Sequence, residues 1–243
     1  MTDLTRLQSI FKEFRETTVL VEKGVAPKCA MPVNPPKFVP AKTVKEINKK
    51  AKSLGLGRIV NKNITDPKAF LRRANEILEE AARVQRKYPM VLKHAKTDKW
   101  SLKSIELWKE SGLDMEGWAG SVGDYTPSDK LIRLASNRSA YEGPILGEMH
   151  VDTTATGVFR HEYGHYLQDR IDKTKAYKEF TELHQKHSSA WWKKNVSNYG
   201  GQDLDEAFAE SFCAYTNPLY RKIRQPRLHP QIENIMEEIT GGL

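Results

Sequence analysis

Apolar residues recur at three- and four-residue intervals along most of the chain, which is the pattern of amphipathic helices. The pattern predicts a first helix over residues 3–16. A second helix should begin at the capping-box pattern TVKE, residues 43–46, and stop near Gly55. A third, long helix should follow an N-cap at Asp66 and end near Tyr88. The chain is therefore expected to be mostly helical.

The middle of the chain has a different pattern. Leu102, Ile105 and Trp108 recur every three residues, which predicts one more helix over residues 101–111. Between residues 117 and 136, the stretch WAGSVGDY, a turn at TPSD and the stretch KLIRLAS alternate in the manner of short strands. Helical patterns return over residues 172–187, 203–215 and 230–239. The predicted fold class is α+β, mostly helical, with a small sheet and a C-terminal helical part.

A proline-rich stretch separates the first helix from the rest. VAPKCAMPVNPPKFVPA, residues 25–41, contains five prolines, which neither a helix nor a central strand tolerates well. We interpret it as an extended linker or strap, so that residues 1–41 form an N-terminal helix and strap and residues 42–243 form the main domain. An extended strap of this kind can cross a cleft of the main domain and inhibit it.

Composition and charge narrow the class of protein. Apolar residues make up 39% of the chain, enough for a real core, and no run approaches the ~20 apolar residues that cross a bilayer. The N-terminus lacks the pattern of a signal peptide, so a cytoplasmic location without membrane contact is expected. Cys29 and Cys213 are far apart and form neither a disulfide framework nor a CxxC zinc site. Cys213 lies in an apolar helical pattern and is interpreted as a buried thiol.

The formal net charge of +8 is unevenly distributed. Residues 41–110 hold 18 Lys and Arg against 8 Asp and Glu, a net charge of +10, whereas the remainder is close to neutral. These lysines lie in helical patterns without interleaved aromatic residues or a nucleic-acid-binding motif. They are interpreted as a solvated face, with nucleic acid as an alternative partner.

The stretch RHEYGHYLQD, residues 160–169, contains a possible metal site. A helix turns by about 100° per residue, so His161 and His165 lie one turn apart on the same face and can reach one metal ion. Zinc binds neutral imidazole nitrogens, and catalytic zinc sites keep three protein ligands and a water. Glu162 would then take a proton from that water, which is the role of the glutamate in HExxH.

The residues around the two histidines favour a buried helix over a solvated one. Val158, Phe159, Tyr166 and Leu167 surround the pair with apolar bulk. Gly164 costs about 1 kcal/mol relative to Ala in a helix interior, so it needs a structural reason. We expect another backbone or a substrate to approach the helix closely there.

A third ligand can come from SNYGGQDLDEAFAESFCAY, residues 197–215. Glu206 and Glu210 lie one helical turn apart on one face of an otherwise apolar helix. A carboxylate from a second buried helix completes a His2Glu zinc site. Glu206 is the predicted ligand, and Glu210 is the predicted acceptor for a histidine ring of the site. If Glu206 is not the ligand, the alternatives are His184, His187, Asp203 and Glu210.

Other polar and aromatic residues near these motifs are given structural interpretations. His150 and Asp152 are polar residues of the loop that enters the motif helix, and we place them outside the site. Trp191 and Trp192 are interpreted as packing residues rather than as the lining of a substrate groove.

Three segments together resemble the catalytic domain of anthrax lethal factor and the related Pro-Pro endopeptidases. They are HEYGH at residues 161–165, SNYGG at residues 197–201 and DEAFAESF at residues 205–212. These peptidases are gluzincins with the pattern HExGH, a Tyr-Gly pair and ExFAE. The resemblance implies a zincin-like fold, one Zn²⁺ per chain, and endopeptidase activity on a protein or peptide. It implies that His161, His165 and Glu206 are zinc ligands, that Glu162 is the catalytic base, and that Tyr199 is the phenol that stabilises the oxyanion.

A second resemblance covers residues 38–240. Three stretches are similar to lethal-factor-like domains of tailed-phage proteins: FVPAKTVKEINKKAKSLG, RRANEILEEAARVQRKYP and KLIRLAS. In those phage proteins, the domain is often attached to a minor head or head-morphogenesis module. The resemblance implies a phage-encoded, virion-associated protein with phage head proteins as partners. The alternative function is a structural phage component that keeps the metalloprotease fold for assembly or docking, with basic helices on nucleic acid. Glu162 and Tyr199 favour chemistry, because a structural zinc site needs neither.

Overall fold

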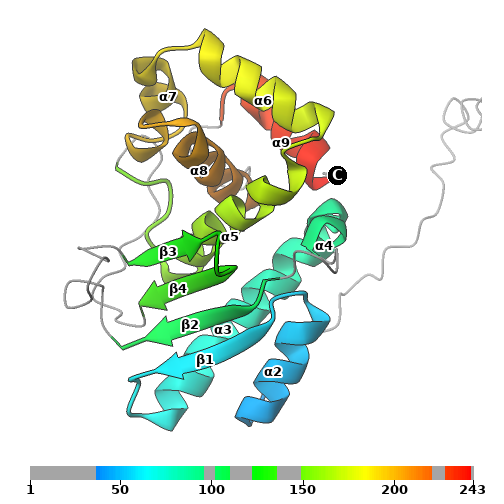
Figure 1. The fold of residues 1–243 in the computed structure, drawn as a ribbon, viewed down its shortest axis with the longest axis vertical. Coiled ribbons are helices and arrows are strands. Elements are labelled where there is room, and N and C mark those ends of the chain that lie inside the picture. Colours follow the sequence, from blue (N-terminus) through cyan, green and yellow to red (C-terminus); the bar gives the residue numbers. More distant parts are fainter. Residues whose placement is uncertain (1–36, 96–101, 110–121, 136–148, 221–227, 242–243) are drawn as a thin grey trace, which may run out of the picture. The chain divides into compact units, whose positions relative to one another are not determined.

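The computed structural model describes residues 37–95, 102–109, 122–135, 149–220 and 228–241 (Figure 1). The chain divides into two units, Met1–Phe38 and Val39–Leu243, and the first lies almost wholly outside the described residues. The predicted helix over residues 3–16, Cys29 and most of the strap therefore also lie outside them. The domain boundary at residue 41 stays a prediction.

The second unit is α+β and mostly helical, as predicted. Its helices are α2 (Val44–Ser53), α3 (Pro67–Lys87), α4 (Pro89–Ala95), α5 (Ala155–Ile171), α6 (Lys175–Lys186), α7 (Ser189–Asn195), the 3-10 helix η4 (Tyr199–Gly201), α8 (Leu204–Thr216) and α9 (Pro230–Thr240). Its strands are β1 (Arg58–Lys62), β2 (Ser104–Trp108), β3 (Gly123–Thr126) and β4 (Leu131–Ala135). Among the described helices, none is long and apolar enough to cross a bilayer.

The four strands form one mixed sheet in the order β1-β2-β4-β3. β1, β2 and β4 run parallel, whereas β3 is antiparallel to β4 and lies at the edge of the described sheet. Helix α2 packs on β1, α3 on β2, and α5 on β3 and β4. Figure 1 shows α5 between this sheet and the group formed by α6 to α9. The edge strand β3 is thus placed directly beside the helix that contains the two histidines.

The predicted helix over residues 101–111 is wrong, because Ser104–Trp108 form the strand β2. Strand β2 is hydrogen-bonded to β1 on one side and β4 on the other. Ile105 and Leu107 are fully buried and their neighbours are half-buried, which is the two-residue alternation of a strand. In so short a segment, a three-residue spacing of apolar side chains does not distinguish a helix from a strand, and pairing on both sides decides the structure.

The other predicted elements within the described residues are confirmed. The Thr43 hydroxyl accepts the Glu46 N–H while the Glu46 carboxylate accepts the Lys42 N–H, so the predicted capping pattern starts α2. Asp66 caps α3 by accepting the Lys68 N–H. β3 and β4 are the predicted strands, and α6, α8 and α9 are the predicted C-terminal helices. The sequence patterns did not predict β1, α4, α7 or η4.

A buried ion-pair network attaches α5 to α3 and α8. The Arg160 guanidinium lies between the carboxylates of Glu80 on α3 and Asp152 in the loop before α5. Arg83 also pairs with Glu80, at 2.6 Å, and Asn217 donates to Asp152 at 2.8 Å. Because losing one partner of a buried pair typically costs about 3–5 kcal/mol, the network fixes the start of α5 relative to its neighbours.

Candidate metal centre

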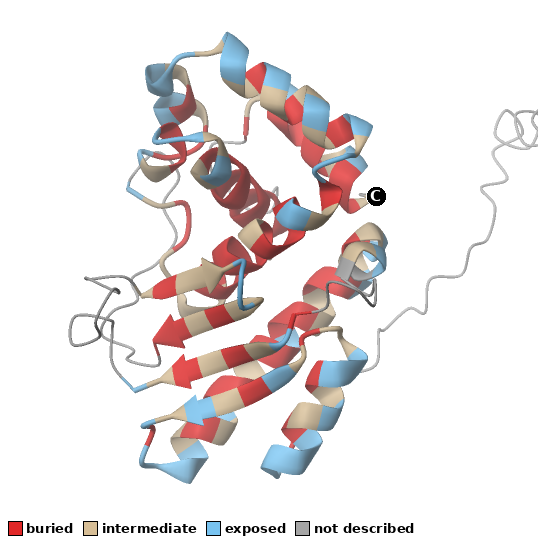
Figure 2. Ribbon diagram, viewed as in Figure 1, coloured by how far each residue is buried: buried red, intermediate tan, exposed pale blue. Residues whose placement is uncertain are grey.

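Helix α5 positions three of the predicted site residues. Its N-cap is Thr154, whose hydroxyl accepts the Gly157 N–H, and the helix is buried along most of its length (Figure 2). The rings of His161 and His165 project from adjacent turns, with centroids 4.8 Å apart. The burial expected from the apolar bulk around the histidines is therefore confirmed.

Gly164 lets α8 approach the motif helix closely. A Cβ atom added at Gly164 would lie 3.1 Å from the Cα atom of Ala209, which is tighter than nine in ten real Cβ contacts. This close approach by another backbone is the reason predicted for a glycine in the helix interior. It brings the carboxylates of α8 to the histidines of α5.

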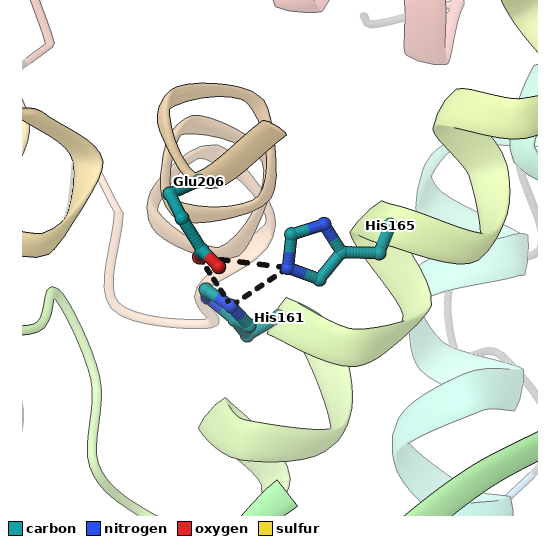
Figure 3. Close-up of side chains that lie close together, drawn as sticks. All are labelled: His161, His165 and Glu206. Carbon is teal, nitrogen blue, oxygen red and sulfur yellow. Dashed lines mark hydrogen bonds and ion pairs between the residues drawn. The ribbon is translucent and has the colours of Figure 1, made fainter. Parts of the chain in front are cut away.

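Glu206 reaches the two histidines from the first turn of α8 (Figure 3). Its Oε2 atom lies 3.1 Å from His161 Nε2 and 3.5 Å from His165 Nε2, and the two Nε2 atoms are 3.1 Å apart. All three potential ligand atoms lie within 4.8 Å of one another. Two helices thus bring the predicted ligands together, as the sequence patterns and the resemblance implied.

The donor set fits a zinc ion. Ligands at 2.0–2.1 Å from a tetrahedral ion lie about 3.3 Å from one another, which matches the observed separations. The Oε2 atom of Glu206 is buried, and within the described part of the chain it accepts no hydrogen bond despite its nearness to both rings. A buried carboxylate oxygen without a donor is costly, and a cation at this point would satisfy it.

Glu210 holds the His161 ring from behind. Its side chain is 2% exposed, and its carboxylate is 2.7 Å from His161 Nδ1. It also accepts the Val151 N–H and the Ser197 hydroxyl, each at 2.7 Å. Because an ionised carboxylate only accepts, His161 Nδ1 must donate to Glu210. Burial would lower the pKa of His161, but Glu206 and Glu210 outweigh burial and raise that pKa well above the ordinary value, so an ion bound at Nε2 would displace a proton.

The charges of this cluster favour a cation. Burial would raise the pKa of Glu206, but the two histidines beside it outweigh burial and lower its pKa to about 2. Burial likewise opposes ionisation of Glu210, yet His150, His161 and Ser197 hold its pKa well below the ordinary value. Both carboxylates are therefore ionised at neutral pH.

Glu162 lies beside the histidines, under the edge strand. Burial raises the pKa of its carboxyl to about 7, against the lowering effect of His161 and His165. A Cβ atom at Gly123 in β3 would lie 2.5 Å from Val158 Cγ1 and 2.8 Å from Glu162 Oε1, so a side chain at this position would displace both. A carboxyl with a pKa near neutrality suits a group that takes and returns a proton.

Tyr199 closes the site from the other side. Its N–H donates to the Met149 carbonyl at 2.9 Å, and its ring centroid lies 5.8 Å from that of His161. Burial and the adjacent Glu206 carboxylate raise the pKa of the phenol above its ordinary value. The phenol therefore keeps its proton at neutral pH and can act as a hydrogen-bond donor.

A cavity of about 290 Å³ opens beside these groups. His161, Glu162, Tyr199 and Glu210 line it. His150 and Asp152 line it as well, which corrects the interpretation that placed them outside the site. The carboxylate of Asp152 is occupied by Arg160, so that residue has a structural role, whereas the His150 side chain is 36% exposed.

The residues held open as alternative ligands lie elsewhere, apart from Glu210. His184 and His187 pack against Trp192 and Trp191, with centroid distances of 5.2 and 4.0 Å. Asp203 caps α8 by accepting the Glu206 N–H. The two tryptophans thus pack, as interpreted, and Cys213 is a buried free thiol, also as interpreted. The cavity beside the histidines includes none of the four aromatic side chains.

Comparison of the sequence with protein-family models gives no match, and comparison with curated proteins gives none either. What the chain can do therefore rests on its own side chains. These comprise a group of three potential ligands, a buried carboxyl beside them, and a phenol across a shared cavity.

Proposed function

We propose that the chain is a zinc-dependent endopeptidase of the gluzincin type, with a zincin-like fold. The observation that carries the proposal is the convergence of His161, His165 and Glu206 within 4.8 Å, beside a cavity that His161, Glu162 and Tyr199 line. A structural zinc site usually has four protein ligands, whereas a catalytic one has three and leaves a position for water or substrate. Three ligands beside an open cavity support the catalytic kind.

The three ligand residues would hold the ion through His161 Nε2, His165 Nε2 and a carboxylate oxygen of Glu206. When bound there, Zn²⁺ lowers the pKa of water toward ~7 and polarises a carbonyl group. Glu210 keeps the His161 ring in the tautomer that ligation requires, through the 2.7 Å contact with Nδ1. The ligands are thus oriented before the ion binds.

Glu162 is proposed as the general base and acid. It takes a proton from the attacking water and passes it to the nitrogen of the leaving amine. Its position between the histidines and β3 places its carboxyl at the cavity wall. In the metal-free site, burial raises the pKa of this carboxyl to about 7, closer to neutral pH than the pKa of an ordinary carboxyl.

Tyr199 is proposed to donate its phenolic hydrogen to the oxygen of the scissile carbonyl. Negative charge develops on that oxygen in the transition state, so this hydrogen bond is stronger there than in the ground state. Removing one such donor typically slows the reaction about 10²- to 10³-fold.

The substrate is proposed to be an extended segment of a protein or peptide. β3 is one of the two edge strands of the described sheet, and an edge strand can pair with an added peptide strand. Gly123 of β3 and Glu162 line the same cavity, so a peptide beside this strand would pass the base. From the second resemblance we also propose that the enzyme is phage-encoded and acts with phage head proteins in the producing cell or the virion.

Cleavage of a proteome-derived peptide library tests the proposed activity. We expect cuts that disappear after chelation and return when zinc is added. Glu162→Gln is the matched control, because it keeps the side-chain shape and removes the base. A folded, zinc-loaded wild-type protein that cuts no peptide would instead support a docking role.

Nucleic-acid contact is a second candidate function, favoured by one observation. Lys42, Lys45, Lys49 and Lys52 are all exposed and recur at three- and four-residue spacing along and just before α2. Binding to a DNA duplex through them should weaken steeply with salt, and replacing all four with Gln should reduce the salt dependence by about four counterions. If the substituted protein is retained on DNA as strongly as the wild type, these four lysines do not form a nucleic-acid-binding face.

A further inference from the structure

The loop segment that precedes α5 is held in place on both sides of His150. The Met149 carbonyl accepts the Tyr199 N–H at 2.9 Å, and the Val151 N–H donates to Glu210 Oε2 at 2.7 Å. These two bonds attach the segment to η4 and α8. The backbone of His150 is therefore fixed relative to the metal centre, although the residue lies in a loop.

The side chain of His150 lies at the wall of the cavity. Its ring packs against that of Tyr199, with centroids 4.5 Å apart and planes 54° apart. The side chain is 36% exposed, and the residue lines the same cavity as Glu162. Val122 and Val158 line it as well, so the wall offers both apolar surface and a ring nitrogen.

The Glu210 carboxylate influences which ring nitrogen of His150 carries the proton. His150 Nδ1 lies 3.7 Å from Glu210 Oε1, which is longer than a hydrogen bond but close enough for electrostatic attraction. A carboxylate favours the proton on the nearer ring nitrogen, so neutral His150 carries it on Nδ1. Nε2, on the opposite side of the ring, then has a lone pair for an external donor.

We propose that His150 binds the substrate by accepting a backbone N–H of the bound peptide at Nε2. Tyr199 would bind a carbonyl oxygen and His150 an N–H, and a peptide backbone offers both kinds of group. The inference rests on the proposed endopeptidase function, because it assigns a further contact in the same cleft. It makes His150 a determinant of substrate affinity rather than a metal ligand.

The test compares His150→Phe with the wild type in two assays. His150→Phe keeps a ring against Tyr199 and removes the nitrogen. In the Glu162→Gln background, immobilised protein should retain a proteome-derived peptide library about tenfold less well after His150→Phe, the loss expected for one hydrogen bond. In active protein, KM should rise about tenfold while kcat changes less than twofold. His150→Asn, which restores an acceptor, should recover part of the affinity.

His187→Phe is the matched control. His187 also stacks on an aromatic ring, that of Trp191 at 4.0 Å, but it is not part of the cavity wall. Unchanged retention and KM for His150→Phe, with losses only for His150→Ala, would reduce its role to ring packing and overturn the inference. Loss of zinc in His150→Phe would also overturn it, because the residue would then act through the metal centre.

Failure of the proposed function gives a different result. If the wild type cleaves nothing but Glu162→Gln retains peptides in a manner that depends on His150, the binding role survives without catalysis. If nothing is cleaved or retained, both proposals fail. If the wild type cleaves with a KM that His150→Phe leaves unchanged, only the His150 inference fails.

Discussion

Replacing Glu210 with Gln is a sharp test of how the site is oriented. The carboxylate accepts from three donors: the His161 ring on Oε1, and the Val151 N–H and the Ser197 hydroxyl on Oε2. Gln has nearly the same shape but has one NH2 group and one oxygen. If the NH2 group faces His161, Nδ1 must become an acceptor, and the proton then moves to Nε2, the ligand atom. If the NH2 group faces Val151, two donors oppose each other in a buried site.

Either orientation of the amide weakens the metal site. Loss of the group that orients a ligating histidine typically lowers metal affinity 10- to 100-fold, or about 1.4–2.7 kcal/mol. Zinc affinity can be measured by competition with a chromophoric chelator at constant pH. Ser197→Ala is the control, because it removes one donor from Oε2 and leaves the His161 contact. Because the Ser197 hydroxyl also accepts the Gly200 N–H at 2.9 Å, we expect the substitution to cost about 1–3 kcal/mol of stability and to change zinc affinity little.

The refuting result is a Glu210→Gln protein that binds zinc as tightly as the wild type. His161 would then not need Glu210 to select its tautomer, and the proposed orientation of Nε2 would be incorrect. Weak zinc binding by Ser197→Ala, equal to that of Glu210→Gln, would also contradict the reasoning. Lower stability of the folded protein, and not a change in the tautomer of His161, would then explain the loss of zinc affinity in both variants.

Three further predictions concern the ligand, the phenol and the buried network. Glu206→Ala should remove zinc, measured as metal content after dialysis; a full complement of metal would show that another residue is the ligand. Tyr199→Phe should keep zinc and lower kcat about 10²- to 10³-fold in steady-state assays, and an unchanged kcat would exclude the phenol from the transition state. Burial raises the pKa of Glu80, but Arg83 and Arg160 outweigh it and hold the pKa below the ordinary value. The resulting stabilisation is therefore present above the unfolded pKa of 4.5 and is lost as the pH falls through the folded pKa. Urea unfolding between pH 6 and pH 2 should show this loss in the wild type and a shallower one in Glu80→Gln; equal slopes would contradict it.

Local sequence patterns predicted the parts of the fold that are determined locally. The four-residue spacing of His161 and His165 defines one face of a helix, and capping residues such as Asp66 define where helices begin. Strand β2 was mistaken for a helix because its conformation depends on pairing with β1 and β4, which lie far away in the sequence. Gly164 was an informative exception, since a costly glycine indicated a close approach before the partner helix was known.

In the candidate site too, the sequence predicts residues whose positions depend on local spacing and misses those placed by long-range contacts. The chemistry of zinc requires a third ligand, so a carboxylate on a buried helix pointed to Glu206. The contact between Val151 and Glu210 links residues 59 positions apart, and no spacing rule predicts it. His150 was missed for this reason, because a loop residue acquires its place in a cavity only through long-range bonds. Ser197 precedes Tyr199 by two residues, yet only the fold brings its hydroxyl to Glu210.

The central claim is that the histidine and glutamate cluster holds a catalytic zinc ion. The most direct measurement determines zinc content and peptide cleavage in the same samples of wild-type and Glu162→Gln protein. The account predicts one zinc per chain in both proteins and cleavage by the wild type alone. A fully zinc-loaded wild type without cleavage, or equal cleavage by both proteins, would contradict it.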